Sequence, residues 1–338
     1  MGEKAMLVVA DTNYLQRDEL AQFLSNGAEF GVVLIPEVYR EALSEARVDQ
    51  AREAFSILAK FPEQVYWSKR MDVLFEQRPS SQLDIIDMPG THGLREGLKN
   101  LPTITDAVWH EAIKYSSEQS EKLLTEFIAH SADLEVAFKS ERSKWRGKDR
   151  RALNDTSLRI SDQQTARIVD FAFSFASLGR KNAVKGDELS ERMREFSFRL
   201  GACYAAWLIG RVAQGAVKCD AREARNDQID NVVCAYATYF SGYLTFDFKR
   251  PIYTFQEARS IIASVEHAIC RSNGFANLPA IALPGGELPR ERPIVDEPSH
   301  VSWLLCFANS LRGRTAVDLH AAGERGKDAI LKANKGAG

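Results

Sequence analysis

Four acidic residues occupy positions from which their carboxylates would meet at one edge of a parallel sheet. Asp11 and Asp247 each directly follow a short apolar run that is expected to form a strand. Asp230 opens a segment with helical spacing that leads into the second of these strands, and Glu41 lies in the second turn of another helix. Proteins with parallel α/β sheets form their sites at the carboxyl ends of the strands. We therefore expect the four carboxylates to converge.

Carboxylates gathered in this way repel one another, and they stay ionised together only if cations neutralise them. Ligand sets made of oxygen alone suit Mg²⁺ or Mn²⁺. The arrangement therefore predicts a divalent metal site with Mg²⁺ or Mn²⁺ as the cofactor. Each residue taken singly also has a structural alternative, because an Asp after a strand or before a helix is often a turn or cap residue.

The elements that must position these residues alternate between strand and helix near the N-terminus. Residues 6–10 and 31–35 are apolar, β-branched runs that predict buried strands, and residues 65–68 predict a third strand. Helical spacing over residues 17–25 and 36–58 fills the intervals between them. This order predicts an α/β fold in which a parallel sheet is flanked by helices.

The pattern becomes almost purely helical in the middle of the chain. Residues 79–105 are rich in Pro and Gly and predict an irregular connection. Three helical segments follow, at residues 105–140, 161–178 and 187–215. The last of them is apolar over much of its circumference, which predicts packing in a core or in a dimer interface.

The α/β pattern returns with a helix over residues 230–241 and a strand over residues 243–246. We therefore expect a core in two parts, separated by a helical insertion and followed by a helical C-terminal extension that packs on the core. In order, the first part of the core, the insertion, the second part of the core and the extension span residues 1–78, 79–220, 221–272 and 273–338.

Four short motifs in these two parts occur in a familiar order. Residues 8–15 (VVADTNYL) join a strand to Asp-Thr-Asn-x-Leu, and residues 35–41 (IPEVYRE) place a Pro and a Val before an acidic residue on a helix. Asp230 then opens an Ala-rich helix, and residues 242–247 (GYLTFD) end in Thr-x-Asp. The ordered set resembles the PIN-like domain family of nucleases, over roughly residues 5–75 and 225–270.

The resemblance implies a PIN-like core that hydrolyses phosphodiester bonds with the help of divalent metal ions. An endoribonuclease is the main expectation, and a toxin or defence nuclease would fit. Single-stranded DNA is the alternative substrate. The two parts of the core are farther apart in this chain than in the family, because the large helical insertion lies between them.

The resemblance also implies roles for individual residues. The four acidic residues would be catalytic residues and metal ligands, with Asp247 as a ligand or as the partner of one. Thr12 or Asn13 would orient Asp11 or contact a phosphate, and Thr245 would do the same beside Asp247.

Two further carboxylates are reserve metal ligands. The spacing from Pro36 to Glu41 departs slightly from the second family motif, so Glu37 is the reserve for Glu41. Asp227 is the reserve for Asp230, because residues three apart can share a helix face.

A basic stretch over residues 139–151 (KSERSKWRGKDRR) is a candidate binding segment for nucleic acid. Its seven basic residues outnumber two acidic ones, and basic side chains neutralise phosphates while an exposed Trp stacks on a base. The alternative is a solvated linker whose Trp packs into the core. The substrate-binding candidates in this stretch are Arg142, Lys144, Trp145, Arg146, Lys148, Arg150 and Arg151.

The composition limits the other classes of function. A net charge of −2 argues against a protein that coats nucleic acid over its whole surface, although it permits a local patch. The five cysteines form no C-x-x-C pair, which predicts reduced core residues rather than a zinc site. No apolar run reaches the ~20 residues of a membrane span, and the N-terminus does not read as a secretion signal. We expect a cytoplasmic protein, with a homodimer or a regulatory protein as a further partner to consider.

Three other interpretations stay open. One is a degenerate PIN-like module that binds RNA or a protein without cutting, which the direction of Glu41 relative to Asp11 and Asp230 would distinguish. A haloacid-dehalogenase-type phosphatase also begins with a strand and an Asp, but Asn13 replaces its usual general acid. A purely helical scaffold would contain no acidic cluster.

Overall fold

The computed structural model describes residues 6–143, 168–176 and 194–245, apart from a few single positions within them. Those positions are Glu45, Arg78, Ser80, Ser174, Gln214, Ala216, Val217 and Cys219. In this part of the chain a four-stranded parallel sheet has helices packed around it, so the α/β class is confirmed. The strands, in chain order, are β1 (Met6–Ala10), β2 (Phe30–Leu34), β3 (Val65–Trp67) and β4 (Gly242–Leu244).

The order of strands across the sheet is β3-β2-β1-β4, and every neighbouring pair is parallel. β1 and β2 are β-branched runs whose side chains are almost all buried, as expected for strands covered on both faces. The first three strands add in one direction across the sheet, and β4 then adds on the other side of β1. The strand order therefore reverses between β1 and β4, and in such sheets ligands bind at the carboxyl ends of the strands at this point.

Helices fill the rest of the described chain. The α-helices with both ends in the described chain are α1 (Asp18–Ser25), α2 (Pro36–Leu43), α3 (Val48–Ser56), α4 (Met71–Glu76), α5 (Gln82–Ile85), α6 (Met88–Lys99), α7 (Asp106–Ser143), α11 (Phe196–Ala213) and α12 (Ala221–Ala237). Short 3-10 turns are η1 (Thr12–Tyr14), η2 (Leu58–Lys60), η3 (Pro62–Gln64) and η4 (Leu101–Thr103).

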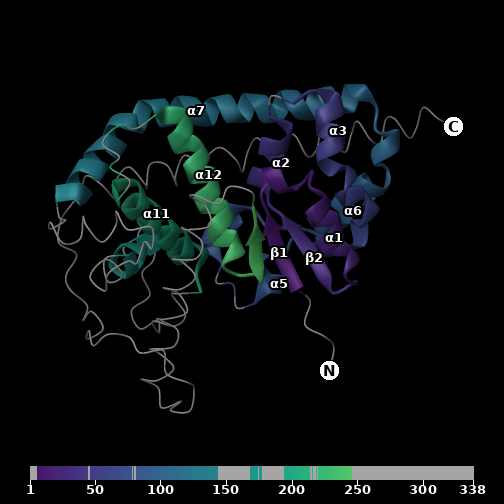
Figure 1. Cartoon of the computed structure of the whole chain (residues 1–338), viewed down its shortest axis with the longest axis horizontal. Coiled ribbons are helices and arrows are strands. Elements are labelled where there is room, and N and C mark those ends of the chain that lie inside the picture. Colours follow the sequence, from purple (N-terminus) through teal and green to yellow (C-terminus); the bar gives the residue numbers. More distant parts are fainter. Residues whose placement is uncertain are drawn as a thin grey trace, which may run out of the picture.

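The long helix α7 crosses the whole described molecule, from the side of α11 to the side of α3 (Figure 1). It contacts α2, α3, α11 and α12, and α12 in turn contacts β1, β4 and α2. The helix therefore connects the N-terminal strands and helices to the helices that precede β4. Its position brings α2 and α12, which are far apart in sequence, against a common neighbour.

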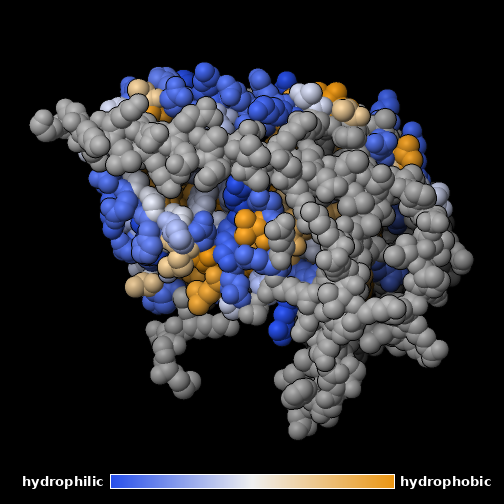
Figure 2. All heavy atoms as spheres, turned by 180° about the vertical axis from the view of Figure 1, so that it is seen from behind, coloured by the Kyte–Doolittle hydropathy of each residue, from blue (hydrophilic) through white to orange (hydrophobic). Residues whose placement is uncertain are grey.

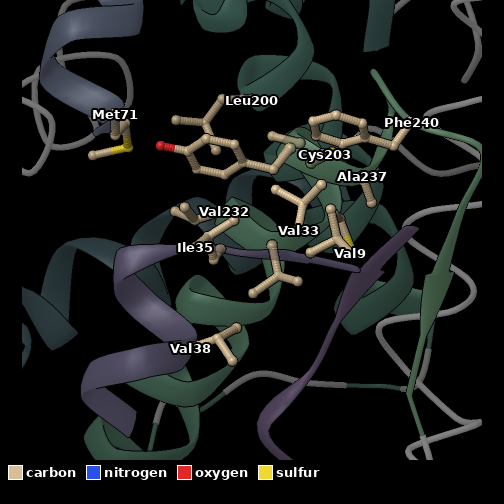
Figure 3. Packing of buried hydrophobic residues seen from close by; sticks show 14 of the residues in the cluster. Val9, Val33, Ile35, Val38, Met71, Leu200, Cys203, Val232, Ala237 and Phe240 are labelled. Atoms are coloured by element: carbon tan, nitrogen blue, oxygen red, sulfur yellow. The ribbon is translucent and has the colours of Figure 1, made fainter. Parts of the chain in front are cut away.

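One hydrophobic cluster joins the sheet to α11 and α12. Figure 3 shows strand residues meeting side chains from both helices: Val9, Val33, Leu200, Cys203, Val232 and Ala237. Cys203 and Cys234 are buried in this core, so the expected core position is confirmed for these two cysteines. The sheet and the helices before β4 therefore share a single core in the described residues.

The expected irregular connection over residues 79–105 was wrong, because most of it is helical. Within it, α6 begins where the Asp87 side chain accepts a hydrogen bond from the backbone N–H of Gly90 at 3.1 Å. The hydroxyl of Thr91 accepts a hydrogen bond from the backbone N–H of Trp67 at 2.9 Å, which ties the helix to β3. Prolines in the first turn of a helix are tolerated, and contact with the sheet outweighs the low helix propensity of the glycines.

Two helix boundaries also differ from expectation. Asp230 was expected to open a helix, but α12 begins nine residues earlier, where Asp220 caps it by accepting hydrogen bonds from Arg222 and Glu223 at 2.9 Å. The single helix expected over residues 36–58 is divided into α2 and α3. A cap stands at the division, where the side chain of Gln50 accepts a hydrogen bond from the backbone N–H of Arg47 at 3.0 Å before α3 begins.

On the face shown in Figure 2, the visible described surface is mainly hydrophilic, with small groups of hydrophobic residues. Among the helices of the described residues, none combines the length and the apolar character that crossing a membrane requires.

The packing of α11 on the helical segment 168–176 gives a test of this fold. Gly201→Ala is expected to lower the free energy of unfolding by about 1–3 kcal/mol. The new Cβ would lie 2.9 Å from Cβ of Phe175 and 3.1 Å from Cα of Ala172. Gly93→Ala is the control, since nothing lies within 4 Å of the added Cβ. Its free energy of unfolding is expected to rise by roughly 0.5–1 kcal/mol, because alanine has the higher helix propensity. Urea unfolding measures both, and an unchanged Gly201→Ala protein would contradict the close approach.

Candidate functional site

Asp11 lies at the carboxyl end of β1, where the strand order reverses. Its backbone N–H donates to the carbonyl of Leu244 at 2.8 Å. The side chain is almost fully buried, with Oδ1 accepting from the backbone N–H of Thr12 at 2.7 Å and Oδ2 accepting from Oγ1 of Thr245 at 2.8 Å. The bonds with Leu244 and Thr245 hold the ends of β1 and β4 together beside the Asp11 carboxylate.

Glu41 reaches the same place from α2. The hydroxyl of Thr12 donates to its Oε2 at 2.6 Å, so one threonine contacts both acidic residues, Asp11 through its N–H and Glu41 through its hydroxyl. Thr12 belongs to η1, the turn that leaves β1. The first two expected metal ligands therefore lie side by side, as the sheet argument predicts.

The environment of Glu41 disfavours its charged form. Burial raises the pKa of this carboxyl most, and the negative charge of Asp11 raises it further. The hydrogen bond from Thr12 and the positive charge of Arg225 oppose the rise without cancelling it. A cation bound between Glu41 and Asp11 would remove the repulsion and favour the ionised form of both.

Asp230 lies on α12 near the same end of the sheet. Burial is the main reason that the pKa values of Cys234 and Tyr243 are raised, and the charges of Asp11 and Asp230 both add to it. The two carboxylates are therefore close to the same pair of buried side chains, although they are separated by more than two hundred residues. The structure brings Asp230 to the neighbourhood of Asp11 from within the helix rather than from its first turn.

The reserve residue Asp227 is used in the contact between two helices. Its Oδ2 accepts a hydrogen bond from Nε1 of Trp207 at 2.8 Å and lies 3.5 Å from Nε of Arg211. Both partners belong to α11. A carboxylate held in this way ties α12 to α11.

The other reserve, Glu37, pairs with Nη2 of Arg40 at 3.0 Å one turn along α2. Burial raises the pKa values of Tyr204 and Tyr236, and the charge of Glu37 contributes to both. Glu37 therefore lies near the tyrosines of α11 and α12, whereas the acidic residue that affects Glu41 is Asp11.

The remaining predicted residues are divided between described and undescribed parts of the chain. Asn13 is exposed in η1, and Arg142 is exposed near the end of α7. Asp247 lies outside the described residues, as do the other members of the basic stretch: Lys144, Trp145, Arg146, Lys148, Arg150 and Arg151.

A partly open cavity of about 120 Å³ lies beside Glu41, between α2, α7 and α12. Two arginines, Arg40 and Arg225, help to line it, together with the hydroxyls of Ser44 and Ser120. Sequence analysis missed these residues. Only the position of the two arginines in the sequence indicated them. Arg40 precedes Glu41 directly, and Arg225 precedes Asp230 by little more than one helical turn.

The chemistry of the donor set fits a hard divalent cation. Asp11, Glu41 and Asp230 offer only oxygen, and the charge of Arg225 does not cancel the effects of burial and of Asp11 on the Glu41 carboxyl. In the described part of the chain, no three His, Cys, Asp or Glu side chains are grouped closely enough to hold a metal by themselves. Mg²⁺ keeps several waters and commonly uses one or two carboxylates plus substrate phosphates, so a complete protein cage is not required.

Searches with protein-family models, against curated proteins and against solved structures gave no match to this chain. The candidate site is therefore supported by its geometry and by the residue pattern alone.

The raised pKa of Glu41 predicts how stability depends on pH. Because the folded pKa lies above the unfolded value, ionised Glu41 lowers stability, and this cost grows as the pH rises from the unfolded pKa, near 4.3, through the folded one. Glu41→Gln removes the cost while its amide oxygen still accepts the Thr12 hydroxyl. In EDTA, the urea midpoint of the variant relative to wild type is expected to be higher at about pH 7.5 than at about pH 4.

The matched control for this measurement is Glu53→Gln, at an exposed position on α3. Its midpoint relative to wild type is expected to change little between the two pH values. If Glu41→Gln instead loses stability at the higher pH, the carboxylate of Glu41 is stabilised by a positive charge, and the account of its environment is wrong.

The hydroxyl of Thr245 gives a second test of the site. Thr245→Val keeps the shape but leaves Oδ2 of Asp11 without this donor, and the expected loss is about 1.5–3 kcal/mol of unfolding free energy. Thr125→Val on α7 is the control, because that hydroxyl is exposed and bonds only its own helix, so a change within about 0.5 kcal/mol is expected. Equal losses in the two variants, measured by urea unfolding, would show that the Asp11 contact adds nothing.

Proposed function

We propose that the protein is a metal-dependent nuclease with a PIN-like core that hydrolyses phosphodiester bonds in RNA. The observation that carries the proposal is the hydrogen-bonded set of Thr245, Asp11, Thr12 and Glu41 at the point where the strand order reverses. Two carboxylates are fixed there at the edge of the sheet where α/β proteins bind ligands. A set of this kind is costly to bury unless cations neutralise it, which supports a role in binding metal rather than in stability.

The positions of the motifs support the PIN-like interpretation. Asp11 follows β1, Glu41 lies on the helix after β2, and Asp230 lies on the helix that leads into β4. This is the order and the sheet edge that the resemblance implies. The expected fourth acidic residue, Asp247, comes two residues after Thr245, whose hydroxyl contacts Asp11.

Asp11, Glu41 and Asp230 are the residues that would hold Mg²⁺ or Mn²⁺. The bound ion would offset negative charge on the phosphoryl oxygens and make water a better nucleophile at neutral pH. The chain itself contributes orientation. Thr12 holds both Asp11 and Glu41, and Thr245 holds the second oxygen of Asp11, so neither carboxylate has to be ordered when the substrate binds.

A second candidate function is a PIN-like module that binds RNA or a protein without cutting it. The observation in its favour is that no three acidic, His or Cys side chains are grouped to hold a metal within the described residues. The phosphatase alternative is weaker, because Asn13, exposed after the first Asp, replaces the general acid that this class uses. Measurement of RNA cleavage distinguishes the nuclease from both alternatives.

The test is cleavage of a mixed RNA pool by the full chain in Mn²⁺ or Mg²⁺, beside an EDTA sample and an Asp11→Asn variant. We expect metal-dependent cutting that the variant reduces by at least about 100-fold, since losing even a residue that supports a ligand typically costs 10–100-fold. Asp18→Asn, at an exposed position on α1, is the matched control and is expected to cut like wild type.

Thermal unfolding with Mn²⁺ adds a readout that does not depend on activity. A ligand at about 100 times its Kd stabilises the folded state by roughly 2.7 kcal/mol, so wild type is expected to melt higher with Mn²⁺ and Asp11→Asn is not. Failure of a folded wild type to cut either RNA or single-stranded DNA would favour the module that binds without cutting. Cutting that persists in Asp11→Asn would refute the site.

A further inference from the structure

The cavity beside Glu41 holds two arginine side chains that the proposed metal site does not use. Arg40 lines it from α2 and Arg225 from α12, while Ser44 and Ser120 add hydroxyl groups. Its volume of about 120 Å³ is well above the roughly 10–15 Å³ that one water needs by this measure. The cavity therefore has room for a tetrahedral oxyanion. Its lining offers N–H and O–H donors to one, and it also includes the carboxylates of Glu37, which pairs with Arg40, and of Glu41.

Within the described part of the chain, Arg225 forms no ion pair with an acidic residue. Its Nε and Nη2 donate to the neutral amide oxygen of Asn226 at 3.1 and 2.9 Å. Among the described residues, no carboxylate lies at salt-bridge distance from it. The pKa of Glu41 is raised by burial, and the charge of Arg225 opposes that rise, so the guanidinium is near the carboxylate without pairing with it. A partly buried guanidinium without a carboxylate partner indicates an anionic ligand.

Arg40 contributes a second guanidinium from the other wall. Its Nη2 is taken by Glu37 at 3.0 Å, and its Nε donates weakly to the carbonyl of Pro36 at 3.3 Å. The hydrogen bonds of the described residues leave Nη1 unused. Guanidinium groups present their N–H donors in a planar fork that matches pairs of phosphate oxygens. Two such groups on facing helices suit one phosphate better than they suit a carboxylate.

We propose that this cavity binds one phosphate of an RNA strand, through Arg225 and Arg40, next to the phosphodiester bond that is cut. This inference rests on the proposed function, because it places the bond to be cut at Asp11 and Glu41. The two sites share their walls: Arg40 and Glu41 are neighbours on α2, and Arg225 and Asp230 lie on the same helix. A strand that reaches the carboxylates therefore passes the cavity.

The experiment measures RNA binding in EDTA, where no cutting is possible under the proposal. The probe is a fluorescein-labelled oligouridylate of about 12 nucleotides, titrated at several salt concentrations. The variants of the full chain are Arg225→Met and, as a matched control, Arg222→Met, whose arginine is exposed one turn earlier on α12. Urea midpoints confirm that each variant folds, and a parallel titration uses inorganic phosphate as a competitor.

We expect Arg225→Met to weaken binding about tenfold and to reduce the slope of log K against log salt by about 0.7, the value for one phosphate contact on a single strand. Arg222→Met is expected to change neither. Inorganic phosphate is expected to displace the probe from wild type and to have little effect on the Arg225→Met protein.

Equal weakening by the two variants, or no weakening by Arg225→Met, would overturn the proposal. Phosphate binding that depends on Arg225 but does not compete with the oligonucleotide would also overturn it, and would mark a site for free phosphate. Failure of the proposed function is distinguishable. If wild type never cuts but its RNA binding still depends on Arg225, the nuclease proposal fails and the phosphate site stands as part of a binding module.

Discussion

The pairing of β4 with β1 is the constraint on which the rest of the structure depends. Thr245 and Asp11 are 234 residues apart, and their side chains meet at 2.8 Å where the two strands end. Closing a loop of that length costs conformational entropy that local interactions do not offset. The cost is offset by the common core of the sheet, α11 and α12. The candidate site is therefore a product of long-range packing, and it exists only in the fully folded chain.

That packing places negative charge where water is scarce. Asp11 is 5% exposed, and the pKa of Glu41 is raised by burial and by its acidic neighbour. A protein selected for stability alone would gain by replacing these groups with apolar ones. Their presence beside Arg225 and Thr12 is consistent with a site that trades stability for function. By contrast, Asp227 lies 3.5 Å from Arg211 and serves the contact between helices.

Sequence analysis predicted the strands well because β1 and β2 are short, β-branched and almost fully buried, and few other structures suit such runs. It predicted the meeting of Asp11 and Glu41 because parallel strands share an edge. It failed over residues 79–105, where contact with β3 overrides the weak helix propensity of Gly and Pro. It also missed Arg225, since only the crossing of α7 over α2 and α12 turns that residue into part of a cavity.

The shared walls of the two sites have a thermodynamic consequence. Glu41 contributes to the candidate metal site and also lines the cavity, and the charge of Arg225 acts on its pKa. An anion in the cavity would offset the positive charge of Arg225 and make ionised Glu41 less favourable, whereas a cation at Glu41 would oppose that effect. Coupling between binding events is reciprocal, so the effect of the anion on cation affinity equals the effect of the cation on anion affinity. A strand of RNA that places phosphates at both sites would therefore bind in a way that depends on whether the metal ion is present.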